Sequence, residues 1–546
     1  MKKSLAILLL CALLTGCGAQ PAESTPGTTA PAPTEVTEPA EVVKEITGDV
    51  VDIALDGQNI TVSGDAEGVY TSRDIVYYED RDTYDSGNPY GEGAQADMHT
   101  AEEASAHLVV NITAPGNYRL SGKLDLGQIR IDLGQEACSD PSAVVNLILD
   151  GLEITCTVGP AILFQNVYEC DGSWSVDTAK PDVDTTAAGA NLILAENSKN
   201  IVNGSYVAKI YKDQEGEKKL WKQDGALYSY MSLNVYGPGA LEINAENEGM
   251  DTELHLTIFG GDITIRSGND GINTNEDGVS VTAIRGGDLR IVAGLGEEGD
   301  GIDSNGYLVI YGGTVISAAN PAADAGLDSD LGSFIHGGTV VALGSTMDWA
   351  ESDSDQVTMN LQFAQAQRGD IRILREDSTE VFTFAPAADP VLSRNLRSYQ
   401  GAILSCPDFR VGDAYVVFVD GIQMAYTGTD VMSGPGGFRP GEGNQRPEGG
   451  IGLPEDRDPD NMPQPPVGDV QIPPQPPVDM PAVPQGEAPT MPEGEIPTWP
   501  EGEIPTMPEG EIPTWPEGQQ MSGGQPQTLF FMQDKVNFFT GLSPVQ

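Results

Sequence analysis

The sequence predicts an all-β fold, a parallel β-helix built from short stacked coils with a small β-rich cap towards the C-terminal end. Glycine pairs recur every 25 or 26 residues, at 260/261, 286/287, 312/313 and 337/338. Apolar and polar residues alternate around each pair, as in β-strands, and the glycines mark the bends between strands. An acidic motif also recurs before each pair. A fixed period of this length is typical of a stacked architecture.

Two apolar columns support this prediction. Isoleucine stands two positions before each glycine pair, at Ile258, Ile284, Ile310 and Ile335. Two positions after each pair stand Ile263, Leu289, Val315 and Val340. One coil cannot bury these residues alone, whereas coils stacked about 4.8 Å apart bury both columns. A β-sandwich with accidental glycine spacing explains the intervals less well, because it gives no reason for columns in register.

The N-terminal end predicts export and a lipid anchor. Residues 1–17 contain Lys2 and Lys3, a short apolar run and the lipobox-like Leu14-Thr15-Gly16-Cys17. We expect cleavage before Cys17 and lipidation of Cys17, which places the protein on the extracellular face of the cell membrane. An ordinary secretory signal with a coincidental cysteine is the alternative. Residues 18–45, rich in Pro, Thr, Ala and Glu, predict a disordered tether.

The boundaries of the other domains are placed where the amino-acid composition changes. We expect the β-helix at 46–354 and the β-rich capping domain at 355–433, where the glycine pairs stop. Residues 434–526 are rich in Pro, Gly and Glu and predict disorder. Their eight-residue repeat from Met491 is either a spacer or a multivalent binding segment. The apolar segment 527–546 either returns to the folded body as a strand or forms a peripheral helix.

The net charge limits the classes of ligand that the chain can bind, and the cysteines indicate which disulfides it could form. Asp and Glu outnumber Lys and Arg by 82 to 28, for a formal net charge of -54. This excludes nucleic acid as a ligand and favours cations. Cys138, Cys156, Cys170 and Cys406 allow disulfides in an exported chain, and Cys156 with Cys170 closes the shortest loop. We expect a monomer.

The acidic motif is EGMDTE at 248–253, DGINTN at 270–275, DGIDSN at 300–305 and AGLDSD at 325–330. Stacking aligns its positions into columns of oxygen ligands, namely Glu248, Asp251, Glu253, Asp270, Asn273, Asn275, Asp300, Asp303, Asn305, Asp328 and Asp330. The coil spacing is about twice a calcium–oxygen distance of ~2.4 Å, so one ion can take ligands from two coils. Oxygen ligands without His or Cys favour calcium over transition metals. The alternative is that Asp-Gly and Asn-Gly simply form tight turns.

Aromatic residues offer a second type of sugar contact. Neutral glucans stack on aromatic rings, and Tyr307, Tyr311, Trp349 and Trp174 are the candidates.

The segments NITAPGNYRLSGKLDLGQIRIDL, NLILDGLEI, GPAILFQNV and DGIDSNGYLVIYGGTV resemble bacterial carbohydrate-binding-domain lipoproteins, whose fold is similar to that of pectate lyases. The resemblance covers about residues 50–350. It implies a right-handed β-helix, bound calcium and binding of polysaccharides such as cellulose or polygalacturonate, without cleavage. Ala325 departs from the pattern, because the other motifs have an acidic residue there.

The alternatives in function are a calcium-dependent polysaccharide lyase, or a related pectin-degrading enzyme, and a structural surface stalk without a sugar ligand. A lyase needs a base beside the metal, and only Arg266, Arg285 and Arg290 occur among the acidic coils. Solvated arginines are ordinary beside strands. We therefore favour a non-catalytic polysaccharide-binding protein.

Overall fold

The structure, a computed structural model, describes residues 44–63, 67–78, 93–172, 175–211, 219–345, 348–429 and 526–545. The signal peptide with Cys17, nearly all of the tether, Trp174 and nearly all of the Pro-rich segment lie outside these residues. In the described part, β-strands dominate. The helical elements there are α1 (Ala101–Ala106) and the 3-10 turns η1 (Gln95–Asp97), η2 (Gln135–Ser139) and η3 (Leu392–Asn395). The body is therefore mostly β, as the sequence predicts.

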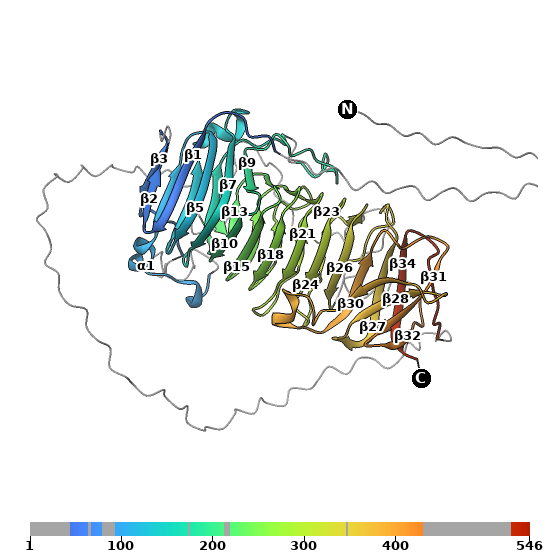
Figure 1. Ribbon diagram of the computed structural model, residues 1–546. Coiled ribbons are helices and arrows are strands. Elements are labelled where there is room, and N and C mark those ends of the chain that lie inside the picture. The colour runs from blue at the N-terminus through green and yellow to red at the C-terminus, as the bar shows by residue number, and fades with distance from the viewer. Residues whose placement is uncertain are drawn as a thin grey trace, which may run out of the picture. The chain divides into compact units, whose positions relative to one another are not determined.

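Most strands belong to three parallel ladders, in which each strand pairs with its counterpart in the next repeat (Figure 1). The first ladder contains β9 (Ala190–Leu194), β14 (Leu233–Tyr236), β17 (Leu256–Ile258), β20 (Val281–Ile284), β23 (Tyr307–Ile310) and β25 (Ser333–Ile335). The second contains β10 (Lys199–Gly204), β15 (Ala240–Ala245), β18 (Asp262–Ser267), β21 (Asp288–Val292), β24 (Thr314–Ala318) and β26 (Thr339–Gly344). The third, which we call the acidic ladder, contains β4 (Leu108–Ile112), β6 (Gly127–Asp132), β8 (Ile162–Asn166), β13 (Gly225–Ser229), β16 (Glu248–Thr252), β19 (Ile272–Thr274) and β22 (Ile302–Ser304).

The register of these ladders follows the glycine pairs. The isoleucine column lies in the first ladder, where Ile258 pairs with Ile284, and Ile284 with Ile310. The column that follows the glycine pairs lies in the second ladder and consists of Ile263, Leu289, Val315 and Val340. All eight residues are buried in the main core. The two columns therefore bury the surface that a single repeat leaves open.

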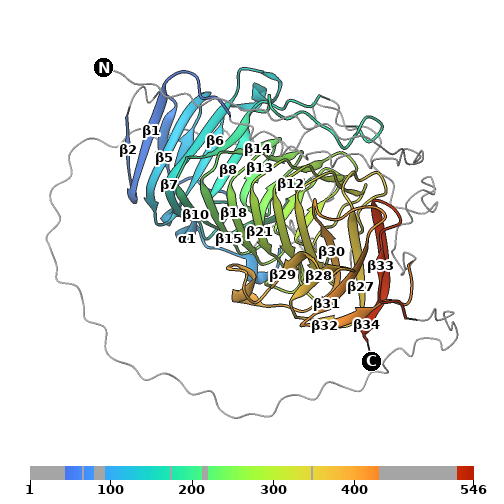
Figure 2. The same cartoon turned by 45° about the vertical axis from the view of Figure 1, so that its right-hand side comes forward.

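The N-terminal end of the body is formed by β1 (Val50–Gly57), β5 (Gly116–Leu124) and β7 (Val145–Thr155), which pair in parallel and lead into both β9 and β10. Two short strands, β2 (Asn59–Val62) and β3 (Val69–Ser72), add antiparallel pairings to β1 and β4. Figure 2 shows these strands at one end of the row and the C-terminal strands at the other.

The C-terminal strands continue the body with antiparallel pairing. Here β26 and β27 (Thr358–Gln367) both pair with β30 (Tyr399–Ser405). A second sheet contains β28 (Ile371–Arg375), β29 (Glu380–Phe384), β31 (Ala414–Val419) and β33 (Phe530–Phe531). The final strand, β34 (Val536–Pro544), lies parallel to β27 and also pairs with β32 (Ile422–Ala425). The last apolar segment thus contributes strands, not a peripheral helix.

The C-terminal part has its own hydrophobic core, and this core includes residues from the outer face of the second ladder, such as Val292 and Val341. The ladder face is therefore covered by the C-terminal strands and by the segment around η3. This arrangement also accounts for two arginines considered as bases. Arg266 contacts Asn395, and Arg290 pairs with Asp389 at 3.1 Å.

Two further observations bear on the sequence predictions. The four cysteines Cys138, Cys156, Cys170 and Cys406 carry free thiols, so the disulfides that their even number allows are not formed. Cys156 is buried in the main core and Cys406 in the C-terminal core, which keeps them apart. Among the described residues, no helix has the length and apolar character needed to cross a bilayer.

Candidate metal centre

The acidic ladder directs the predicted ligands to its outer face. Met250, Ile272 and Ile302 are in register and buried in the core. Because neighbouring residues of a strand point to opposite faces, Asp251, Asn273 and Asp303 line up on the outside. Asp328 continues this column through backbone hydrogen bonds to Ile302 and Ser304.

A second column runs beside the first. Backbone bonds connect Gly249 to Asp270, and Gly271 to Asp300, so that Glu248, Asp270 and Asp300 stand above one another. Ala325 occupies the next position. Asp270 and Asp300 each use one carboxylate oxygen to accept a backbone N–H of the following repeat, at 2.6 and 2.5 Å. These two carboxylates therefore connect neighbouring repeats, which is a different role from the local Asp-Gly turn contact that was the alternative to metal binding.

The third column contains Glu253, Asn275, Asn305 and Asp330, and the first three of these residues form hydrogen bonds within the protein. Tyr228 donates its hydroxyl to Glu253, and Asn275 donates its amide to Asp251. Asn305 donates to the Asn275 carbonyl and to Asp277. Asp330 is exposed at the far end. Three strand-to-strand steps of about 4.8 Å separate Asp251 from Asp328, so the eleven predicted ligands do not surround one ion.

The densest group of carboxylates lies at the opposite end of the columns and includes a residue that the motif did not reveal. One oxygen from each of Asp224, Glu248 and Asp251 lies within 4.8 Å of the others. Asp224 immediately precedes β13. The only sign of it in the sequence is the pair Asp224-Gly225, which resembles the acid–glycine pair that begins the motif. The motif missed it because Tyr228 stands opposite Asp251, where later repeats have Asn or Asp.

This acidic triad, Asp224, Glu248 and Asp251, is surrounded by unpaired acceptors. Glu248 is 4% exposed, Asp251 0% and Asn273 6%. Each retains one buried oxygen without a hydrogen-bond donor: Glu248 Oε2, Asp251 Oδ2 and Asn273 Oδ1. Leaving a buried acceptor unpaired costs about 1–3 kcal/mol, and more when it is charged. The donor set consists of oxygens alone, which fits a hard divalent cation such as calcium.

A lysine from elsewhere in the fold reaches this site. Lys222 lies one residue before the end of the hairpin formed by β11 (Val207–Tyr211) and β12 (Lys219–Gln223). Its Nζ lies 2.9 Å from Asp224 Oδ2 and donates to Asn275 Oδ1 at 2.6 Å. Burial acts to lower the pKa of Lys222, but attraction to the surrounding carboxylates raises it well above the usual value. Lys222 therefore stays charged and offsets one of the negative charges.

Burial, together with the remaining negative charge, raises the pKa of the carboxyls along the columns. Burial, followed by repulsion from Glu248, raises the pKa of Asp251 well above its usual range. Burial raises the pKa of Asp300 to about 7 and that of Asp303 to about 8, with repulsion from Asp328 adding to both. At neutral pH the columns thus favour a bound proton or a bound cation over bare carboxylates.

The predicted aromatic residues lie elsewhere. Tyr307 begins β23 and Tyr311 directly follows it, so both belong to the first ladder. Trp349 packs against Phe538, with ring centroids 6.1 Å apart, and against the main core. The two tyrosines therefore lie at opposite ends of one strand of the first ladder, whereas Trp349 lies in a different environment. Arg285, the third arginine considered as a base, pairs with Asp182 at 3.2 Å beside Tyr311, away from the acidic triad.

Three similarities to known proteins were found. Residues 107–378 match the family model described as carbohydrate-binding domain-containing protein. A carbohydrate-binding domain-containing protein from Acetivibrio thermocellus is 32% identical over 159 residues, which are 29% of this chain and 45% of that relative. The chain thus spans about half the length of the curated relative it matches. A solved structure, that of the polysaccharide lyase-like protein from C. thermocellum (gadolinium derivative), has a TM-score of 0.32 and 22% identity, covering 53% of this chain and 93% of the other.

Proposed function

We propose that this chain, whose residues 107–378 match the model of the carbohydrate-binding domain family, binds polysaccharide without cleaving it, through a calcium ion on the acidic ladder. The proposal of a metal ion rests on three buried oxygens that have no hydrogen-bond donor, one each on Glu248, Asp251 and Asn273. A divalent cation satisfies these oxygens and neutralises two charges at once. Glu248, Asp251 and Asp224 would hold it, with Asn273 as a neutral ligand.

We also infer that the three ladders form the coils of a right-handed parallel β-helix. The support is the cyclic order of the chain, which visits the acidic ladder, then the first, then the second, in each repeat from β13 to β24. The constant register between repeats gives each coil the same path. This fold lines up the outer residues of every coil and thereby builds the columns.

The proposed ligand is a polysaccharide of the polygalacturonate or cellulose type. A surface with a formal net charge of -54 repels polyuronates. Bound calcium supplies positive charge that bridges protein and sugar carboxylates. Asp300, Asp303 and Asp328, which are less buried than Glu248 and Asp251, continue the columns towards solvent. Lipidation at Cys17 and a location on the extracellular face of the membrane are part of this proposal.

A polysaccharide lyase is the alternative from a different class. The arginines considered as bases all have partners away from the acidic ladder, and the raised pKa of Lys222 keeps its amine protonated. Both observations favour binding over base catalysis. Incubation with polygalacturonate and calcium distinguishes the two, because a lyase produces unsaturated ends that absorb in the ultraviolet.

Retention on immobilised polysaccharide tests the proposed function. The protein is applied to polygalacturonate in calcium and again in EGTA, beside the variant Asp251→Asn and the control Asp377→Asn from an exposed turn of the C-terminal part. We expect wild type and control to be retained in calcium and released by EGTA, while Asp251→Asn is not retained. Equal retention with and without EGTA argues against a cation. Failure to retain wild type on any polysaccharide supports the structural stalk.

A further inference from the structure

The C-terminal sheet has an apolar face that does not belong to its core. Residues along β31 alternate between buried and partly buried. Because neighbouring residues of a strand point to opposite faces, the partly buried Ala414, Val416 and Phe418 share the outer face. Among the described residues, the partly buried apolar side chains packed against the C-terminal core are Val381 and Tyr426. The outer face of β31 is therefore not part of that core.

Neighbouring strands widen this face. Register places Phe531 of β33 opposite Ala414, and Leu374 of β28 opposite Val416. Phe531 is 48% exposed, and Leu529, two residues before it, is 43% exposed. Side chains of paired residues lie on the same side of a sheet, so one apolar surface extends over three strands. We call Leu374, Val416, Phe418, Leu529 and Phe531 the C-terminal apolar face.

Elsewhere in the body, apolar outer faces are covered by other parts of the same chain. The first ladder has a small outer cluster of Val281, Ala283 and Val309, against which Val183 of the loop between β8 and β9 packs. The outer face of the second ladder is covered by the C-terminal strands. Within the part of the chain that the structure describes, the C-terminal apolar face has no such cover.

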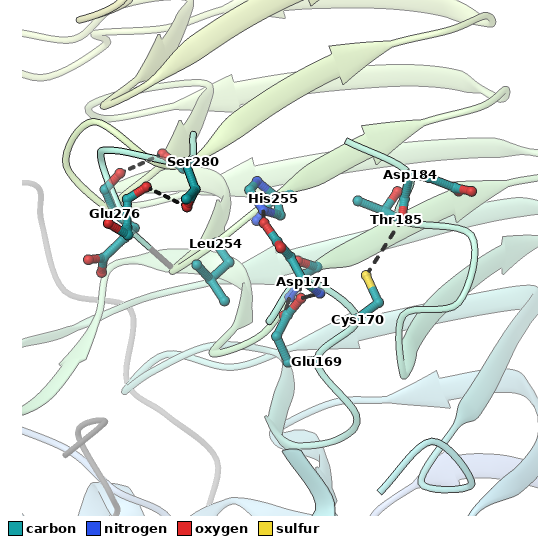
Figure 3. Close-up of polar contacts among 12 residues, drawn as sticks. Glu169, Cys170, Asp171, Asp184, Thr185, Leu254, His255, Glu276 and Ser280 are labelled. Carbon is teal, nitrogen blue, oxygen red and sulfur yellow. Dashed lines mark hydrogen bonds and ion pairs between the residues drawn. The ribbon is translucent and has the colours of Figure 1, made fainter. Parts of the chain in front are cut away.

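The loop between β8 and β9 shows how an insertion covers a neighbouring face. Near its start, Glu169 accepts hydrogen bonds from the Ser232 backbone and hydroxyl. Asp171 then lies 3.1 Å from Nε2 of the buried His255 (Figure 3). The loop leaves the acidic ladder, is fixed to the first ladder by these contacts, and covers the apolar cluster of the ladder that it enters.

A longer insertion begins and ends beside the C-terminal apolar face. Residues 430–525, which lie outside the described residues, follow β32 and precede β33. On either side of them, Tyr426 and Gln527 exchange backbone hydrogen bonds. The Tyr426 hydroxyl also donates to the Leu529 carbonyl at 3.3 Å. Both ends of the insertion therefore lie at the segment that contributes Leu529 and Phe531 to the face.

The insertion carries apolar side chains at a regular spacing. Methionine and tryptophan alternate at the start of each eight-residue copy from Met491 to Trp515, and proline follows each of them. Proline cannot extend the hydrogen bonding of a sheet edge, so the repeat is suited to side-chain contacts with a sheet face rather than to strand addition. Proline-rich segments typically bind to aromatic side chains, which Phe418 and Phe531 provide.

Attachment to the body raises the local concentration of the repeat at this face. A segment joined to its own docking site through a linker of this length behaves like a free ligand at a concentration on the order of 1 mM. The same contact between two separate chains depends on the protein concentration, which is far lower in dilute solution. Attachment therefore favours the repeat of the same chain over that of a second copy.

We propose that the eight-residue repeat, residues 491–518, docks on the C-terminal apolar face of its own chain through its Trp and Met side chains. This contact covers the face in the way that the loop between β8 and β9 covers the first ladder. The Pro-rich segment is then an intramolecular ligand of the body rather than a spacer alone. The contact is independent of the acidic ladder and of any sugar.

Binding of a fluorescein-labelled peptide with the sequence of residues 491–506 tests this proposal by fluorescence anisotropy. The full chain is compared with a variant in which a Gly-Ser sequence of equal length replaces residues 491–518. We expect the replaced variant to bind the peptide. Wild type should bind it at least about fivefold more weakly, because its own repeat competes for the same face.

Two substitutions in the replaced variant locate the docking site. Phe531→Ser should weaken peptide binding at least about fivefold, because it removes an aromatic contact. The matched control Tyr70→Ser, which removes a 51% exposed aromatic side chain from β3, should leave binding unchanged. Melting temperatures near that of wild type show that both variants are folded.

Three results overturn the proposal. The first is no peptide binding by the replaced variant, or equal binding by this variant with and without Phe531→Ser in folded proteins. The second is equal binding by wild type and the replaced variant, because the repeat then does not occupy its own face. The third is a wild-type mass in sedimentation that rises with protein concentration while the replaced variant stays monomeric, which assigns the contact to a second copy.

Discussion

At the scale of single residues, Lys222 determines how the acidic triad behaves without metal. Its ammonium group contacts Asp224 and Asn275 while Glu248 and Asp251 keep unpaired oxygens. A lysine is one positive charge on a flexible stem, and it does not replace a divalent ion that takes six to eight oxygens. Lys222 would therefore compete with a bound cation for the same carboxylates.

Removing this lysine should strengthen cation binding. We predict that Lys222→Met lowers the calcium dissociation constant at least about tenfold, because a competing positive charge beside the site is lost. Isothermal titration of chelator-treated protein measures the change, with Lys199→Met, from an exposed position on β10, as control. An unchanged or larger dissociation constant would mean that Lys222 does not compete with calcium for these carboxylates.

Neutralising one buried carboxylate should have opposite effects in the two metal states. In EGTA at pH 7.5, Asp251→Asn should raise the melting temperature by at least about 2 °C, because it removes a buried carboxyl that must either hold a proton or carry a charge beside Glu248. Adding calcium should raise the melting temperature of this variant less than it raises that of wild type. Thermal unfolding in both buffers checks this, and a variant that melts lower than wild type in EGTA contradicts it.

At the scale of elements, the glycine pairs explain how one ladder turns into the next. The second glycine of each pair has positive φ, +110° at Gly261, +90° at Gly287, +82° at Gly313 and +88° at Gly338. A Cβ at Gly287 would also lie 2.7 Å from the Gly261 carbonyl oxygen. The pairs are thus required both by backbone conformation and by the close approach of successive coils.

This requirement yields a matched comparison. Gly151→Ala, at φ +82° with open space around its Cβ position, should cost about 1–2 kcal/mol in free energy of unfolding. Gly287→Ala should cost more, because it adds a clash with backbone to the same conformational strain. Chemical denaturation of both variants measures the difference. Equal losses would show that the coils separate without cost at this bend.

The sequence predicted the repeating elements well because a fixed period brings equivalent residues into register. Ile258, Ile284 and Ile310 pair in the first ladder for this reason, and Asp251 and Asp303 share a column. It could not predict Lys222, because the hairpin that carries it is an insertion with no counterpart in other repeats. Nor could it separate Trp349 from the tyrosines, since that depends on packing against Phe538, far away in the chain.

At the scale of the whole molecule, the columns make stability depend on pH when no cation is present. The pKa values of Asp300 and Asp303 are raised in the folded state, to about 7 and about 8. A raised carboxyl pKa means that the folded state holds the proton more tightly than the unfolded state. The resulting stabilisation is full below about pH 4 and is lost as the pH rises through 7 and 8.

We therefore predict that in EGTA the melting temperature falls between pH 5 and pH 8.5. Calcium should reduce this fall, since a bound cation replaces the protons, and Asp303→Asn should reduce it even in EGTA. Thermal unfolding over this pH range in both buffers provides the measurement. A melting temperature in EGTA that is constant or rises with pH would show that the carboxylates are compensated in another way.

Direct titration of calcium into the chelator-treated chain tests most simply whether the acidic ladder is a cation site. We expect saturable binding by wild type, with at least one site lost in the double variant Glu248→Gln, Asp251→Asn. Binding that is absent from wild type, or undiminished in a folded double variant, would contradict it.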